Sequence, residues 1–145
     1  METFVLPVQV RWSDLDPNFH LRHSVYYDWA TMSRFNFLRE HKLTPDLMLQ
    51  HNFGPIIFRE EAVFRKEIKF GDNITINLKL VKGRRDYSRW SIVHEIKKDN
   101  DSVCAVVTID GAWMNVIERK LIVPPAEVAH VFQQMPPDEN FQWLD

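Results

Sequence analysis

The stretch Asp14-Leu-Asp-Pro-Asn-Phe-His-Leu-Arg-His-Ser-Val-Tyr26 places two carboxylates, two imidazoles and a tyrosine directly before a long apolar segment. Ser24 is suited to cap a helix that runs from Val25 to about His41. Apolar residues surround much of the circumference of that segment, so we expect most of the helix to be buried. An acid or base held beside the free amides of a helix N-terminus is typical of an enzyme.

The rest of the chain alternates between polar and apolar residues in the way that strands do. Strands are expected at 4–12 before the turn, and after it at 56–70 with a bulge, 74–80, 87–97 and 103–116. Thr44-Pro45 and Pro124-Pro125 each open a short helix, the second over about 126–134, and the tail from Met135 is expected to be irregular. This order predicts an α+β fold, with one curved antiparallel sheet wrapped around one long central helix.

Length and composition indicate one soluble globular domain over residues 1–145, because 45% of the residues are hydrophobic and 26% are charged. No apolar run approaches the roughly 18 residues that cross a membrane, and the N-terminus has no signal-peptide pattern. The net charge of −2 argues against general attraction to nucleic acid. A lone cysteine, Cys104, excludes an internal disulfide, and we expect a buried thiol in a reducing, cytoplasmic setting.

From about Phe4 to Met114 the order of elements resembles that of the hotdog-fold acyl-CoA thioesterases of the 4-hydroxybenzoyl-CoA thioesterase type. Many relatives read Asp-x-x-x-His-Val-Asn-Asn-x-x-Tyr, with Asp, His and Tyr where Asp16, His20 and Tyr26 stand here. Another branch carries its active-site histidine at the position of His23. This sequence departs from both branches, since Phe19 replaces a frequent glycine and Arg22-His23 replaces the Asn-Asn pair.

The resemblance implies thioester hydrolysis, with Asp16 as general base towards water or as a nucleophile that forms a mixed anhydride. His20 and His23 are alternative candidates for the assisting role, either orienting the water or donating to the thioester carbonyl. Asp14 is expected to be structural, bonding turn amides or orienting Arg11 or Arg22. A cysteine-like thiol has a free pKa of about 8.5, so the leaving thiolate needs no strong general-acid assistance.

The amides near Ser24, Val25 and Tyr26 are the expected oxyanion site. Tyr26 is expected to pack in the core or to contact substrate. An acyl tunnel is expected beside the helix, with a lining of residues such as Tyr27, Trp29, Phe53, Phe58 and Phe64. The resemblance also implies that basic residues, namely Lys66, Arg84 and Arg85, contact the phosphates of coenzyme A.

The predicted substrate is an acyl-CoA with a medium or long acyl chain or an aryl group, and acyl carrier protein is an alternative carrier. No cofactor is expected, and a metal site is not expected because His20 and His23 lack a further organised ligand set. The resemblance implies a homodimer or a homotetramer. A non-catalytic hotdog module that binds acyl thioesters or acts as a scaffold is the alternative function, and a dehydratase ranks below it.

Overall fold

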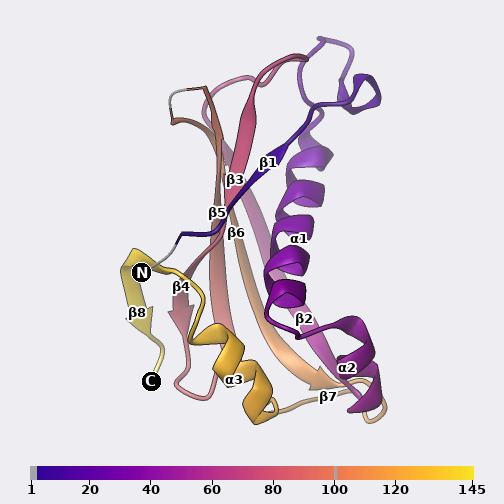
Figure 1. The fold of residues 1–145 in the computed structure, drawn as a ribbon, viewed down its shortest axis with the longest axis vertical. Helices are drawn as coiled ribbons and strands as arrows, with labels where there is room; N and C mark the ends of the chain where they lie inside the picture. The colour runs from indigo at the N-terminus through magenta and orange to yellow at the C-terminus, as the bar shows by residue number, and fades with distance from the viewer. Residues whose placement is uncertain (1–2, 100) are drawn as a thin grey trace.

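The computed structural model describes residues 3–99 and 101–145, and one long helix lies along the inner face of a curved sheet (Figure 1). The helices are α1 (His23–Glu40), α2 (Pro45–Gln50) and α3 (Ala126–Phe132), and a single 3-10 turn covers Trp12–Asp14. The strands are β1 (Val5–Val8), β2 (Phe53–Phe64), β3 (Ile74–Asn77), β4 (Lys79–Gly83), β5 (Arg89–Lys98), β6 (Ser102–Asn115), β7 (Lys120–Leu121) and β8 (Pro137–Trp143). None of the described helices is both long enough and apolar enough to span a membrane.

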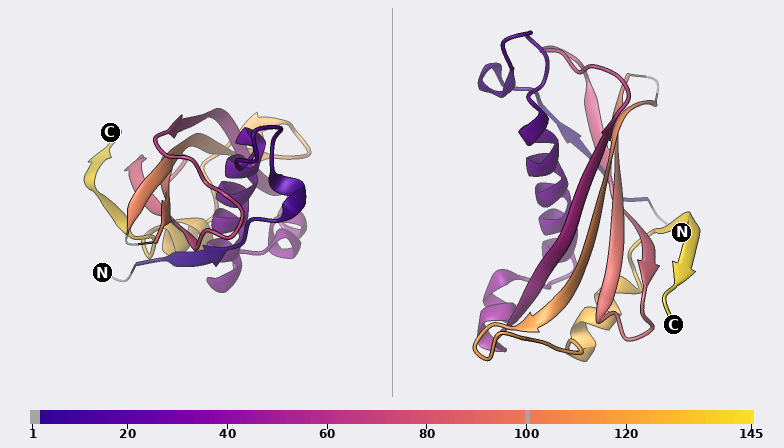
Figure 2. Two further views of the ribbon diagram at one scale, coloured as in Figure 1. Left: turned by 90° about the horizontal axis from the view of Figure 1, so that it is seen from above. Right: turned by 180° about the vertical axis from the view of Figure 1, so that it is seen from behind.

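The sheet is built around β5. One edge of β5 pairs with β6, and the other edge pairs with β3 and then with β4. β2 pairs with β6 on one side of the sheet, while β1 and β8 extend the other side beyond β3 and β4. Every pairing is antiparallel except that of β4 with β8. Seen from above, the sheet curls around α1 (Figure 2), which confirms the predicted α+β arrangement.

Several predicted strand boundaries were wrong. The first strand ends at Val8, and the long strand expected at 56–70 instead runs from Phe53 to Phe64. After Phe64 the regular pairing stops, since the amides of Arg65 and Lys66 both donate to the carbonyl of Cys104, and Ile68 is fully buried in the core. The expected bulge is present, between Ile57 and Arg59.

The C-terminal tail was also predicted wrongly, because it forms a strand. β8 lies parallel to the outer edge of β4, beginning where the amide of Leu80 donates to the carbonyl of Pro136 over 2.8 Å. Phe141 packs against the core cluster and stacks edge-on against Trp143, with ring centroids 4.9 Å apart. The pairing partner lies far away in sequence, so local alternation gave no indication of it.

The long helix differs from its prediction in two ways. It begins earlier, at His23, and Arg22 rather than Ser24 is the N-cap residue. It is also buried on one face only, along a stripe of Val25, Tyr26, Trp29, Ala30, Ser33, Arg34 and Phe37. On the opposite face Met32 is 53% exposed, because the sheet of this chain curves around one side of the helix.

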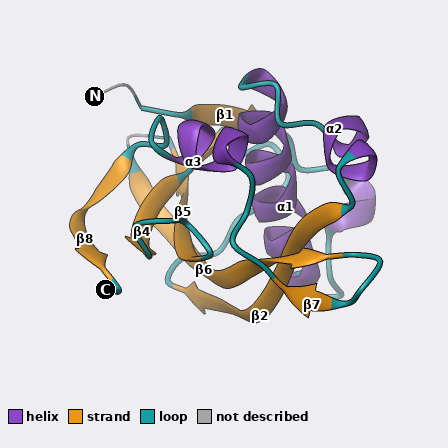
Figure 3. Ribbon diagram, turned by 90° about the horizontal axis from the view of Figure 1, so that it is seen from below, coloured by secondary structure: helices purple, strands orange, loops and turns teal. Residues whose placement is uncertain are grey.

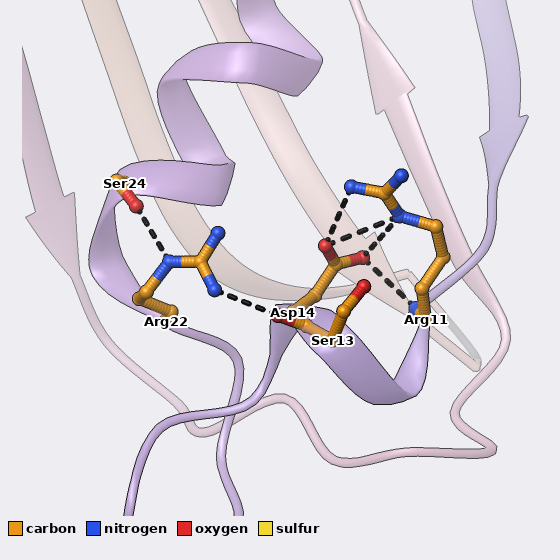
Figure 4. Close-up of polar contacts among 5 residues, drawn as sticks. All are labelled: Arg11, Ser13, Asp14, Arg22 and Ser24. Atoms are coloured by element: carbon orange, nitrogen blue, oxygen red, sulfur yellow. Dashed lines mark hydrogen bonds and ion pairs between the residues drawn. The ribbon is translucent and has the colours of Figure 1, made fainter.

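The loop that precedes α1 is fixed by two arginines (Figure 4). The buried carboxylate of Asp14 accepts hydrogen bonds from the backbone amide, Nε and Nη2 of Arg11, at 2.9 to 3.2 Å. Arg22 donates from Nη1 to the carbonyl of Ser13 over 2.7 Å and from Nε to Oγ of Ser24 over 2.9 Å. The hydrogen bond from Arg11 lowers the pKa of Asp14. Asp14 therefore has the structural role predicted for it.

Gly111 has the closest surroundings of the four glycines. A Cβ atom at this position would lie 2.4 Å from Cη2 of Trp90 and 2.8 Å from the carbonyl oxygen of Ile56. The Trp90 ring therefore occupies the space that any larger residue at position 111 requires. Gly54, in contrast, offers ordinary van der Waals contact, 3.6 Å from Cγ1 of Val116.

We expect Gly111→Ala to lower the free energy of unfolding by about 1–3 kcal/mol, because the added methyl displaces a buried indole ring. Urea denaturation measures the change. Gly54→Ala is the matched control and should shift stability by less than about 0.5 kcal/mol. Equal effects of the two substitutions would contradict the close contact between Gly111 and Trp90.

We expect Asp14→Asn to lower Tm at pH 7, because it removes the charged acceptor for Arg11. A carboxyl whose folded pKa is depressed stabilises the protein above its unfolded pKa, about 4, and that contribution is lost as pH falls further. The Tm difference between wild type and variant should therefore shrink as pH falls below about 4. Glu118→Gln, at an exposed carboxylate, is the control. A difference that stays constant with pH would contradict the assignment.

Candidate functional site

A cleft of about 320 Å³ opens between the loop before α1 and the end of β2. One antiparallel bridge, between Leu15 and Leu21, folds the loop back on itself. A second, between His20 and Lys69, joins the loop to the segment that follows β2. The cleft is lined by Asp16, His20, Leu21, His23, Tyr26, Phe64, Arg65, Lys66 and Glu67. The structure thus brings together both predicted histidines, the predicted carboxylate, Tyr26 and Lys66.

The two carboxylate oxygens of Asp16 have different surroundings. Oδ1 accepts from the amides of Asn18 at 2.9 Å and His20 at 3.1 Å, which closes a tight Asx-type turn. Oδ2 has no hydrogen-bond partner among residues 3–99 and 101–145. Phe19, within the turn, has a φ of 61°, in the left-handed region that favours glycine. One carboxylate oxygen of Asp16 is therefore positioned by the turn while the other remains available to a ligand.

The two histidines have different surroundings. Nε2 of His20 lies 3.1 Å from Oε2 of Glu67, so a carboxylate orients this imidazole. His23 is exposed and is the first residue of α1. Its side chain has no hydrogen bond to the described part of the chain. The geometry leaves both available, with His20 fixed by a neighbour and His23 free to turn.

Tyr26 and Phe64 form the apolar wall of the cleft. Their rings meet edge to face with centroids 4.9 Å apart, and Tyr26 is 4% exposed. Burial raises the pKa of Tyr26 to about 12. The phenol is therefore protonated at neutral pH and cannot act as a base. Its position fits both predicted roles, core packing and contact with a substrate.

The amides at the start of α1 only partly match the predicted oxyanion site. The amide of Val25 donates to the carbonyl of Arg22 over 3.0 Å, so it is not available to a ligand. The amides of His23 and Ser24 have no acceptor within the described residues. The free donors thus lie earlier than predicted, because the helix begins earlier. The Ser24 side chain is occupied, since its Oγ accepts from Arg22.

The predicted phosphate contacts are separated by the fold. Lys66 lines the cleft and its Nζ donates to Oγ of Ser102. Arg84 and Arg85 lie in the turn between β4 and β5, at the end of the sheet where α3 lies (Figure 3). The guanidinium of Arg85 stacks 4.9 Å above the ring of Trp143. Within one chain these two arginines do not reach the cleft.

The predicted acyl tunnel also needs correction. Tyr27, Trp29, Phe53 and Phe58 line neither the cleft nor the apolar cavity beside α1, and only Phe64 reaches the cleft. The cavity beside α1 lies further along the helix. Residues there that the sequence interpretation missed include Arg34, which lines the cavity, and its buried neighbour His94. The sequence did indicate both residues. Arg34 lies one helical turn after Ala30 on α1, and His94 lies on the same side of β5 as Ile96, so each polar residue stands where the pattern places apolar ones.

Comparison of the fold with solved structures places the chain among hotdog proteins. A hypothetical protein from Staphylococcus aureus in complex with CoA has a TM-score of 0.83 at 18% identity, covering 94% of this chain and 88% of the other. A 1,4-dihydroxy-2-naphthoyl-CoA thioesterase from Synechocystis has a TM-score of 0.82 at 16% identity, covering 92% and 97%. A thioesterase from Thermus thermophilus complexed with coenzyme A and Zn has a TM-score of 0.74 at 22% identity, covering 92% and 95%.

No curated protein sequence matches the chain. The model of the thioesterase-like superfamily, in contrast, matches residues 10–132, which include the whole cleft and most of the sheet. The match extends over well over half of the 145 residues. The chain therefore belongs to the thioesterase-like superfamily and is a thioester hydrolase with the hotdog fold.

Proposed function

We propose that the protein hydrolyses the thioester of a fatty-acyl or aryl coenzyme A at the cleft beside the N-terminus of α1. The observation that carries this proposal is the open Oδ2 of Asp16, held by its turn in a cleft that His23, the first residue of α1, also lines. Relatives in fold that were solved with coenzyme A support CoA as the carrier. Acyl carrier protein remains the alternative carrier.

In this proposal the thioester carbonyl lies against the first amides of α1. Their N–H groups stabilise the developing oxyanion, since they have no partner in the helix. Asp16 then acts through Oδ2, either taking a proton from an attacking water or attacking the carbonyl to form a mixed anhydride. The C–S bond breaks and coenzyme A leaves as a thiolate. In the anhydride route, water hydrolyses the intermediate and restores the carboxylate.

The remaining cleft residues have supporting roles in this proposal. His20, oriented by Glu67, or His23 positions the water or donates to the carbonyl oxygen. Tyr26 and Phe64 supply the apolar surface for the first part of the acyl group. Lys66 is the proposed contact for an anionic part of coenzyme A, since it is the predicted basic residue that lines the cleft.

We expect Asp16→Asn to lower turnover by roughly 100-fold or more, with binding of the acyl-CoA largely retained. Asparagine is the appropriate replacement because its Oδ1 can still accept from the amides of Asn18 and His20. Free thiol release is measured with acyl-CoAs from acetyl to palmitoyl, and with benzoyl- and phenylacetyl-CoA. Asp28→Asn, on α1 outside the cleft, is the control and should retain wild-type turnover. Full activity of the Asp16 variant would exclude the proposed role.

The exposed edge of β2 supports a homodimer as part of this proposal. β2 pairs with β6 alone within the described chain, so its other edge presents unpaired backbone groups. Four large apolar residues of this strand are 46 to 51% exposed, namely Ile57, Phe58, Val63 and Phe64. Pairing of two such edges across a two-fold axis would cover them and would bring a second chain to the cleft wall at Phe64.

Light scattering after gel filtration should then give a mass about twice the 17.3 kDa of one chain, or a larger even multiple. We expect Val63→Lys to shift the mass towards the monomer, because a charge at the paired edge is costly to bury. Val123→Lys, at a valine that is 64% exposed outside β2, is the control and should leave the mass unchanged. A wild-type monomer at micromolar concentration would contradict pairing through β2.

A further inference from the structure

A second cavity, of about 360 Å³, lies beside the C-terminal half of α1 and shares no residue with the cleft. It is lined by residues of α1, α2, the first part of β2, β5, β6 and the α3 region. Its lining is almost entirely apolar and includes Trp90, Trp113 and Phe132. The volume is within the range of roughly 300–1,000 Å³ that small-molecule pockets have.

One charged side chain, Arg34, lines this cavity, and it is only 9% exposed. Its Nη1 lies 3.1 Å from Nε2 of His94, and its Nη2 donates to Oγ1 of Thr31 over 3.3 Å. The fully buried His94 has Nδ1 2.8 Å from the carbonyl of Asn77, so Nδ1 carries the hydrogen and Nε2 accepts from Arg34. Burial, followed by the charge of Arg34, lowers the pKa of His94 to about 3, which keeps the ring neutral.

The hydrogen-bond partners of Arg34, namely His94 and Thr31, are thus neutral, although its guanidinium is charged. Burial lowers its pKa to about 10, so the guanidinium is still protonated at neutral pH. No carboxylate within the described residues forms an ion pair with it. Glu60, on the exposed strand β2, acts on Arg34 electrostatically at longer range and raises its pKa. Buried charges in proteins are normally paired, because an isolated one is costly to remove from water.

The guanidinium also has donors to spare. Of its five N–H groups, one is directed to His94 and one to Thr31. The remaining donors suit a planar, two-oxygen acceptor, which guanidinium binds through paired hydrogen bonds. A singly charged group is favoured over a phosphate dianion, because the rest of the lining has little polar surface to solvate a second charge.

We propose that the cavity beside α1 binds an apolar organic molecule through a carboxylate held by Arg34, with its apolar body among Trp90, Trp113 and Phe132. Two sources can supply this chemistry. One is a free organic acid, the class of product that thioester hydrolysis releases. The other is the far carboxylate of a dicarboxylyl substrate, and this second source rests on the proposed thioesterase function.

Direct binding tests the shared chemistry without any catalysis. Octanoate and phenylacetate are titrated into the wild-type protein by calorimetry, together with octanamide and phenylacetamide as uncharged analogues of the same shape. Quenching of tryptophan fluorescence gives a second readout, because Trp90 and Trp113 line the cavity. We expect at least one acid to bind roughly tenfold or more tightly than its amide. Equal affinity for both acids and their amides, or no binding of either acid, overturns the proposal.

Arg34→Met assigns the binding to this cavity, since it retains an apolar side chain and removes the charge. We expect it to abolish the preference for acid over amide. Arg39→Met, at an exposed arginine of the same helix, should retain that preference, and so should Asp16→Asn in the cleft. If Arg34→Met does not fold, the acid and amide comparison with the wild type and Asp16→Asn still decides. A preference that survives in folded Arg34→Met, or is lost in Asp16→Asn, overturns the proposal.

Turnover distinguishes the two sources. The roughly 16 Å of helix between His23 and Arg34 requires a long acyl chain. If the far carboxylate of the substrate is the occupant, Arg34→Met lowers kcat/KM for sebacoyl-CoA roughly tenfold or more and leaves decanoyl-CoA unchanged. If a free acid is the occupant, the variant treats the two thioesters alike and only the binding preference disappears. Absence of turnover on every thioester would remove the proposed function, while the calorimetric comparison of acid and amide still decides whether Arg34 binds a carboxylate.

Discussion

Burial of one face of α1 against the concave side of the sheet organises both the cleft and the apolar cavity. The buried stripe of the helix faces the sheet, with contacts to β3 and β6, and its aromatic and aliphatic side chains supply much of the core. Because the sheet curves around the helix, the two ends of α1 are in different surroundings (Figure 1). The N-terminal end meets a polar loop, and the C-terminal half meets an apolar cavity closed by α2 and α3.

The N-terminal end shows how a short polar segment is made rigid enough for chemistry. Arg11 fixes the carboxylate of Asp14, and Arg22 connects the loop to the first turn of the helix. The turn around Asp16 uses one carboxylate oxygen for its own structure and leaves the other open. Asp14, whose carboxylate accepts more hydrogen bonds, thus stabilises the loop. Asp16, whose carboxylate accepts fewer, lines the cleft.

The interior polar contact between Arg34 and His94 differs from the ion pair of Arg11 and Asp14. It joins α1 to β5 through a charged group and a neutral ring, where two apolar residues would give the same packing without the cost of burying a charge. A neutral histidine satisfies hydrogen bonds of the guanidinium but does not balance its charge. The contact therefore leaves a buried charge with no counter-ion among the described residues, and this distinguishes it from the Arg11–Asp14 pair.

The long helix, most of the strands and the carboxylate-rich turn could be predicted from the residues alone, because these features depend on local spacing. Hydrophobic periodicity predicted the α+β arrangement, and the resemblance to the hotdog thioesterases at Asp16, His20, His23 and Tyr26 predicted residues that share the cleft. Contacts between residues far apart in sequence became visible in the folded chain alone. The fold separated Arg84 and Arg85 from Lys66, paired β8 with β4, and placed His94 against Arg34. Those relations depend on the curvature and pairing of the sheet, which no local pattern encodes.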